Sequence, residues 1–199
     1  MCKYRFQLPA DVTLILASAS PRRRELLSGM GLTFTVCPCD VDESVPQGMH
    51  PADAVVLLAR RKAEAVAALH PDAIVLASDT LVEIDAMPLG KPQDEADAVS
   101  TLMRLSGNEH RVHTGVAVMH RGRCFAEKDT TRVFMRQFDE KEARAYVATG
   151  EPMDKAGAYG IQGLGGRLVE RIEGNYDTVV GLPTRLSDDL LCHLTERDA

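Results

Sequence analysis

Hydrophobic positions along the chain form two patterns: compact apolar runs, and longer stretches in which apolar residues recur every three or four positions. The runs at Leu14–Ala17 and Ala73–Ala77 are typical of buried strands, and the alternation from Leu81 to Asp85 predicts another strand after a turn at Ser78-Asp79-Thr80. The helical pattern predicts a helix after Ser20 that runs through Met30, and further helices at Ala52–Leu69, Asp94–Leu105, Glu140–Ala148 and Leu186–Leu194.

Two long strands are expected in the second half, at Val112–Met119 and Cys124–Met135, with a hairpin turn at His120-Arg121-Gly122 between them. A shorter strand is expected at Leu168–Ile172. Strands alternate with helices at first and pair as hairpins later, which predicts an α/β fold with a mixed sheet and flanking helices. At 199 residues the chain is expected to form a single domain, in one body or two lobes.

The charge balance narrows the classes of partner. A net charge of -6 repels polyphosphate chains, so nucleic-acid binding would require a strong local patch such as Arg22-Arg23-Arg24, whereas a small anion needs only a pocket. No apolar run approaches the roughly 20 residues of a membrane helix. We therefore expect neither a nucleic-acid nor a membrane partner.

Cysteine usage indicates a reducing compartment, and hence a cytoplasmic protein. An odd number of cysteines without a C-x-x-C pair predicts neither a disulfide framework nor a zinc site; the five are Cys2, Cys37, Cys39, Cys124 and Cys192. The basic N-terminus and the apolar run after it are too short to form a secretory signal peptide.

The first candidate site is Ser18-Ala19-Ser20-Pro21-Arg22-Arg23, where a strand leads into a helix with Ser20 as N-cap. The backbone N–H groups and the dipole of a helix start attract anions, and two arginines add guanidinium forks suited to phosphate oxygens. The alternative is a solvated basic face. Because cations at this end oppose the helix dipole, the sequence favours an anion between them.

Lys62 is the second candidate. At 100° per residue it lies near the centre of the apolar stripe of its helix, which also holds Leu58, Ala59, Val66 and Leu69, whereas Arg60, Arg61 and Glu64 point away. A buried lysine needs a partner or loses its charge, so it is either a ligand-binding or a paired structural residue.

Asp79 is the third candidate, because it is expected at the end of an apolar strand with Thr80 beside it. Ligands of open α/β sheets gather at the carboxyl ends of strands, where a carboxylate can hold Mg²⁺ or orient water; a turn aspartate is the alternative. Asp42 and Glu43 are candidates for a second metal carboxylate, although their residues alone favour an ordinary acidic loop.

The glycine-rich segment from Asp154 to Gly166 permits close backbone approach to a ligand, and its Gln162 carries a donor and an acceptor that suit a base edge. A glycine-rich hairpin is the alternative. Lys91, between Gly90 and Pro92, reaches a phosphate only if the fold brings it there. Neither the P-loop nor the Rossmann glycine pattern occurs.

His110 and His113 are expected on opposite faces of a strand, which excludes a metal pair, and we interpret both as surface residues. No G-x-S-x-G elbow or Ser-His-Asp order supports a serine hydrolase.

Four motifs together resemble the Maf family of nucleotide pyrophosphatases over almost the whole chain: residues 16–23, Ser78-Asp79-Thr80, Gly90-Lys91-Pro92 and residues 151–166. The resemblance implies an elongated, two-lobed fold like that of inosine-triphosphate pyrophosphatases, with one domain over residues 1–199 and a cleft between its lobes. It also implies a homodimer and a Mg²⁺- or Mn²⁺-dependent cut between the α and β phosphates. About eight residues before the first strand are not typical of the family.

On the family pattern, Asp79 is the implied proton acceptor and metal carboxylate, and Glu43 the second metal carboxylate. Lys62 and Lys91 are implied cations that position phosphate or water, and the phosphates are held by Ser18, Arg22 and Arg23.

Arg22, Thr80 and Gln162 match the branch that acts on dTTP and UTP, whereas the 7-methyl-GTP branch is expected to carry Trp, Gln and Glu at these positions. The expected function is therefore hydrolysis of dTTP and UTP to monophosphate and pyrophosphate, with CTP or modified pyrimidine triphosphates as further candidate substrates in a house-cleaning role. The alternatives are a nucleotide-binding regulator of cell division with little turnover, or the 7-methyl-GTP activity.

Overall fold

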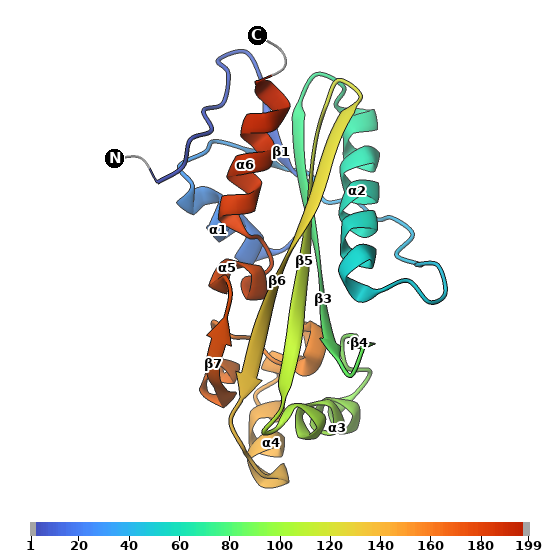
Figure 1. Ribbon diagram of the computed structural model, residues 1–199, viewed down its shortest axis with the longest axis vertical. Coiled ribbons are helices and arrows are strands. Elements are labelled where there is room, and N and C mark those ends of the chain that lie inside the picture. The colour runs from blue at the N-terminus through green and yellow to red at the C-terminus, as the bar shows by residue number, and fades with distance from the viewer. Residues whose placement is uncertain (1–2, 197–199) are drawn as a thin grey trace. The chain divides into compact units, whose positions relative to one another are not determined.

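The computed structural model describes residues 3–196, which fold into a mixed seven-stranded sheet with helices packed on it, as the hydrophobic patterns predict (Figure 1). The strands are β1 (Leu14–Leu16), β2 (Thr35–Val36), β3 (Ile74–Ile84), β4 (Met87–Leu89), β5 (Glu109–His120), β6 (Arg123–Met135) and β7 (Val169–Glu173). The α-helices are α1 (Pro21–Gly29), α2 (Pro51–Leu69), α3 (Glu95–Leu105), α4 (Glu140–Val147), α5 (Tyr176–Val180) and α6 (Thr184–Thr195). Three 3₁₀ helices follow α4, namely η1 (Glu151–Asp154), η2 (Ala156–Ala158) and η3 (Leu164–Leu168).

The strand order is β2-β1-β3-β5-β6-β7, with β4 paired to β3. β1 pairs in parallel with β2 and β3, whereas the β3–β4 and β6–β7 pairs are antiparallel. The turn between β5 and β6 has positive φ at both Arg121 (46°) and Gly122 (79°), as a two-residue type I′ turn requires. The predicted hairpin is therefore confirmed.

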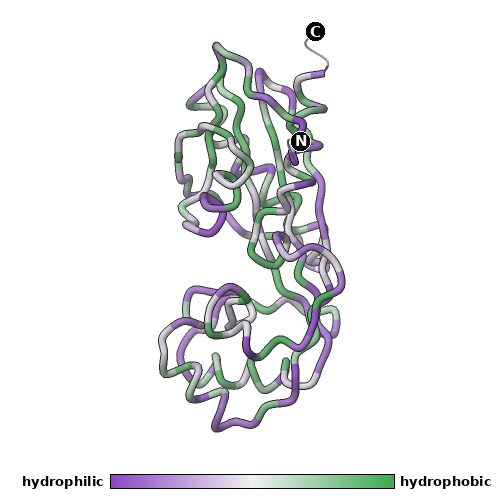
Figure 2. The backbone as a smooth tube through the Cα atoms, turned by 90° about the vertical axis from the view of Figure 1, so that its left-hand side faces the viewer, coloured by the Kyte–Doolittle hydropathy of each residue, from purple (hydrophilic) through white to green (hydrophobic). Residues whose placement is uncertain are grey.

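The chain divides into two compact units. Within the described residues, the first unit comprises 3–79, 114–129 and 181–196, and the second comprises 80–113 and 130–180. Strands β3, β5 and β6 contribute residues to both. Figure 2 shows hydrophobic stretches inside the units and hydrophilic stretches at their outer turns.

In the first unit β1 and the first half of β3 are buried on both faces, which explains their continuous apolar runs. Leu14, Leu16, Ile74 and Leu76 pack with residues of α1 and α6. The residues between them in sequence point the other way, and Ile15 and Val75 pack with the alanine-rich face of α2. The second unit has its own core, built from β3, β5 and β6 residues such as Val82 and Val133 with the apolar faces of α3 and α4.

The N-terminal segment before β1 packs against α6. The buried carboxylate of Asp188 accepts hydrogen bonds from Arg5 N (3.0 Å) and Phe6 N (2.8 Å), and Phe6 joins the core of the first unit. The segment therefore has a structural role, which sequence patterns did not reveal.

One local prediction is wrong. The end of a strand expected at Ser78-Asp79-Thr80 is absent, because these residues are extended within the single strand β3. The alternative for the glycine-rich segment, a hairpin, is also not found, because the segment forms a series of 3₁₀ turns. In residues 3–196, no helix has both the length and the hydrophobicity to cross a membrane.

Candidate active site

The first turn of α1 is built as its sequence predicts. Ser20 is the N-cap, and its side chain accepts a hydrogen bond from Arg23 N at 3.4 Å, while Pro21 starts the helix. The first turn contains no acidic residue, so Arg22 and Arg23 add positive charge to the positive end of the helix dipole.

Arg23 is held in place by hydrogen bonds within the first unit. Its Nε donates to Gly181 O at 3.0 Å, and its Nη1 donates to Ser18 Oγ at 3.3 Å. Ser78 Oγ donates to the same Gly181 carbonyl at 3.1 Å. Burial lowers the pKa of Arg23, although the carboxylates of Asp79 and Glu43 oppose this effect. An arginine remains charged despite such a shift, so a fixed cation faces these carboxylates.

Lys62 forms ion pairs with two carboxylates, those of Asp79 and Glu43. Its Nζ lies 2.6 Å from Asp79 Oδ1 and 2.8 Å from Glu43 Oε1. The side chains of Lys62 and Asp79 are 13% and 11% exposed, whereas Glu43 is 65% exposed. Burial by itself would lower the pKa of Lys62, but attraction to Asp79 and hydrogen bonds to Asp79 and Glu43 outweigh it and raise the pKa. Lys62 is therefore a stable cation at neutral pH.

The helical stripe places Lys62 correctly. Leu58, Ala59 and Val66 of the same stripe are buried, as predicted. Leu69 is 71% exposed, because it is the last residue of α2 and extends beyond the core.

Asp79 does not end a strand. β3 continues to Ile84, and Asp79 lies buried in the middle of the strand. It is the last residue of β3 that belongs to the first unit. The turn propensity of Ser-Asp-Thr is overridden here by strand pairing and by the ion pair with Lys62.

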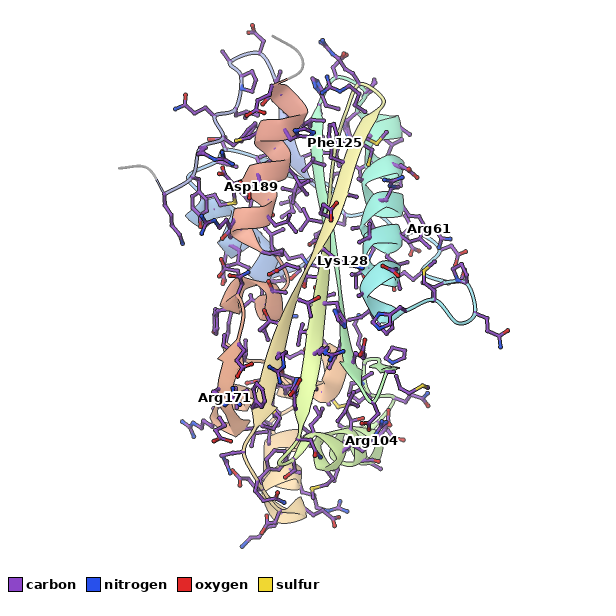
Figure 3. All side chains as sticks on the ribbon, viewed as in Figure 1. Arg61, Arg104, Phe125, Lys128, Arg171 and Asp189 are labelled. Atoms are coloured by element: carbon purple, nitrogen blue, oxygen red, sulfur yellow. The ribbon has the colours of Figure 1, made fainter. Side chains whose placement is uncertain are left out.

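The loop that carries Glu43 is fixed by α2. Arg61 Nη1 donates to the carbonyl oxygens on both sides of Glu43, at 2.9 Å to Asp42 O and 2.5 Å to Ser44 O. Figure 3 labels Arg61 on α2. Asp42 itself turns to Ser44, whose Oγ donates to it at 2.7 Å. Of the two acidic residues, it is therefore Glu43 that meets Lys62.

The structure thus gathers part of the predicted site in the first unit: Ser18, Arg22, Arg23, Glu43, Lys62 and Asp79. Thr80 follows Asp79 on β3 but belongs to the second unit, as do Lys91, between β4 and α3, and the exposed Gln162, between η2 and η3.

The donor set suits a hard divalent cation. Mg²⁺ takes one or two carboxylates and completes its shell with water and substrate phosphates, and Asp79 and Glu43 already converge on one cationic group. Among residues 3–196 no group of three or more His, Cys, Asp or Glu side chains could hold a metal ion by itself. A metal here would therefore depend on phosphate oxygens and water.

The two histidines are not surface residues, contrary to expectation. His110 and His113 are each 2% exposed, because both faces of β5 are covered at these positions. His110 Nε2 lies 2.8 Å from the Tyr159 hydroxyl, and His113 Nε2 lies 3.0 Å from Glu83 Oε2. Burial lowers the pKa of His110 to about 4, against the weaker effect of Glu109.

Sequence patterns missed the groups that position the candidates. Ser78 and Gly181 are 103 residues apart and carry no motif that links them to Arg23. The free thiols Cys37, Cys39, Cys124 and Cys192 lie outside this set of contacts, apart from Cys39 Sγ, which is 3.6 Å from Lys62 O; Cys2 lies outside the described residues.

Comparison with known proteins supports one family. A family model described as "Maf-like protein" matches residues 13–194. A dTTP/UTP pyrophosphatase of Pelotomaculum thermopropionicum is 49% identical over 89% of this chain and 94% of that protein. The dTTP/UTP pyrophosphatases of Vibrio cholerae and Moorella thermoacetica are 51% and 53% identical, each over 89% of this chain and over 96% and 93% of those proteins. Among solved structures, the Staphylococcus aureus Ham1 protein aligns with a TM-score of 0.43 and 15% identity, over 62% of this chain and 71% of that chain.

Proposed function

The chain belongs to the Maf family, and we propose that it is a nucleoside triphosphate pyrophosphatase that hydrolyses dTTP and UTP to the monophosphate and pyrophosphate. Relatives about half identical over most of their length carry that name. The observation that carries the proposal is the convergence of Lys62, Asp79 and Glu43, with Arg23 fixed at the adjacent helix start.

This set of charges suits phosphoryl chemistry, which requires positioning and charge neutralisation more than covalent catalysis. The cations Arg22, Arg23 and Lys62 outnumber the two carboxylates, so an anionic triphosphate is attracted on balance. Ser18, Arg22, Arg23 and the N–H groups of α1 bind phosphate oxygens, and Lys62 stabilises the charge that develops during the reaction.

Asp79 accepts the proton of the water that attacks the α-phosphorus, and the bond between the α-phosphorus and the bridging oxygen to the β-phosphate breaks. Asp79 and Glu43 would hold Mg²⁺ or Mn²⁺, which when bound supplies charge neutralisation on the phosphates. In the second unit, Lys91 is proposed as a further phosphate-binding cation, and Thr80 and Gln162 as the residues that select the pyrimidine base.

We also propose that the two units act as one catalytic domain, and that the enzyme works as a homodimer in the cytoplasm, without nucleic acid or membrane. The free thiols support a reducing, cytoplasmic compartment, and the net charge of -6 disfavours a nucleic-acid partner. Removal of CTP or modified pyrimidine triphosphates would be a house-cleaning role for the same site.

The test is a substrate panel with purified protein and Mg²⁺ or Mn²⁺, in which monophosphate and pyrophosphate are both quantified for dTTP, UTP, CTP and 7-methyl-GTP. We expect equimolar products, fastest from dTTP and UTP. A preference for 7-methyl-GTP would instead assign the chain the 7-methyl-GTP activity. Tight nucleotide binding without turnover would favour a nucleotide-binding regulator of cell division.

A further inference from the structure

The glycine-rich segment of the second unit is folded around one carboxylate, that of Glu151. Its Oε2 accepts a hydrogen bond from Leu164 N at 2.9 Å, and its Oε1 accepts one from Gly165 N at 3.1 Å. The hydroxyl of Tyr146 donates to Oε1 at 2.8 Å and accepts a bond from Gly160 N at 3.1 Å. Backbone groups on both sides of Gln162 are thus tied, directly or through Tyr146, to Glu151.

The glycines of this segment let the backbone approach these side chains closely. A Cβ on Gly163 would lie 2.5 Å from both carboxylate oxygens of Glu151, and a Cβ on Gly165 would lie 2.5 Å from the Tyr146 hydroxyl. A Cβ on Gly160 would lie 2.7 Å from Cε of Lys155. The close backbone approach that the glycines allow is therefore to Glu151, Tyr146 and Lys155.

The carboxylate is well suited to hold a loop. Burial would raise the pKa of Glu151, but hydrogen bonds from Leu164 N, Gly165 N and Tyr146 outweigh this and lower the pKa. Glu151 is therefore ionised at neutral pH, and charge-assisted bonds to a carboxylate are stronger than neutral ones. Gln162, at the centre of the loop, is exposed.

We infer that Glu151 is a positioning residue for base selection, because it fixes the loop backbone that presents the Gln162 amide to the pyrimidine. This inference rests on the proposed function and extends it to a residue that contacts no substrate. Tyr146 acts in the same way, since its hydroxyl joins Gly160 to the carboxylate.

The test compares kcat and KM for dTTP with those for GTP in Glu151→Gln, which keeps the shape of the side chain but replaces one acceptor oxygen by a donor amide. We expect KM for dTTP to rise about tenfold and the dTTP-to-GTP preference to fall about tenfold, with kcat for dTTP within about threefold of wild type. The matched control is Glu140→Gln, which removes an exposed ion pair with Arg144 on the same helix and should leave the preference unchanged.

A double-mutant cycle separates positioning from general loosening. If Glu151 acts through Gln162, adding Glu151→Gln to Gln162→Ala should change the preference no further. Multiplicative losses, or an unchanged preference in folded Glu151→Gln, would overturn the inference. If Glu151→Gln does not fold, the dTTP-to-GTP preference is measured in Tyr146→Phe instead, and the same fall in that preference is expected. A wild-type protein that releases no pyrophosphate from dTTP overturns the proposed function itself, and this inference with it.

Discussion

At the scale of one residue, the sequence predicted that Lys62 is buried but not which carboxylates it contacts. Its place on an apolar stripe was readable from sequence, but its partners lie 17 and 19 positions away in a strand and in an irregular loop. No periodic pattern predicts which carboxylate of such a loop turns inward. From the residues alone Asp42 and Glu43 were equivalent candidates, and only the family resemblance singled out Glu43; in the structure the contacts of Ser44 and Arg61 distinguish the two.

Lys62→Met tests whether the ammonium competes with a metal for the two carboxylates. Without it, Asp79 and Glu43 have lost their shared cation, so Mn²⁺ affinity in the absence of nucleotide should rise at least about tenfold, or roughly 1.4 kcal/mol. Titration calorimetry of the nucleotide-free protein with Mn²⁺ measures this affinity. The control is Lys128→Met, which removes an exposed partner of Asp53 in the same unit; Lys128 is labelled in Figure 3. Equal or weaker Mn²⁺ binding by Lys62→Met would contradict the account.

The buried His110 predicts a dependence of stability on pH. Its pKa is about 4 in the folded chain and about 6.5 when unfolded, so below pH 6.5 the unfolded chain binds a proton that the folded chain does not. The contribution of His110 is complete above pH 6.5 and is lost as pH falls towards 4.

The loss should amount to roughly 2 to 3 kcal/mol at pH 4.5 relative to pH 7.5. Urea unfolding at both pH values, for wild type and His110→Gln, measures it, since the variant should lack this part of the acid sensitivity. Identical pH profiles would show that His110 titrates normally.

At the scale of elements, patterns that combine periodicity with a cap or turn signal were reliable, and strands of two or three residues were mostly missed. The helices α2, α3, α4 and α6 and the β5–β6 hairpin were predicted nearly to their ends, because each combines periodicity with a cap or turn signal. β2 and β4, of two and three residues, are too short to show alternation. β3 was split in two because Ser78-Asp79-Thr80 resembles a turn when its partners are unknown.

The packing of α2 on β5 provides a prediction at this scale. A Cβ on Gly115 would lie 2.3 Å from Val55 O in the first turns of α2, and backbone cannot move aside as a flexible side chain can. Gly115→Ala should therefore destabilise the protein by about 1–3 kcal/mol and lower turnover, because the displaced helix carries Lys62.

Thermal unfolding and dTTP hydrolysis measure the two effects. The control is Gly29→Ala in α1, where a Cβ meets nothing within 4 Å and helix propensity favours alanine. A Gly115→Ala protein as stable and active as wild type would show that α2 tolerates displacement.

At the scale of the whole molecule, sequence reasoning recovered the fold class and the family but could not derive the assembly of the site. Ser18, Glu43, Lys62 and Asp79 come from four separate segments, and each alone had a structural explanation at least as good as the functional one. Only the order of several motifs along the chain indicated a shared function. The contributions of Lys91, Thr80 and Gln162 from the second unit remain part of the proposal.

The most direct test of the central claim is the turnover of Asp79→Asn with saturating dTTP and Mg²⁺. The amide keeps the size of the side chain but cannot accept the proton of the attacking water, so kcat should fall by about 10²- to 10⁴-fold while thermal unfolding shows a folded protein. A folded Asp79→Asn variant that releases pyrophosphate within a few-fold of the wild-type rate would contradict the account.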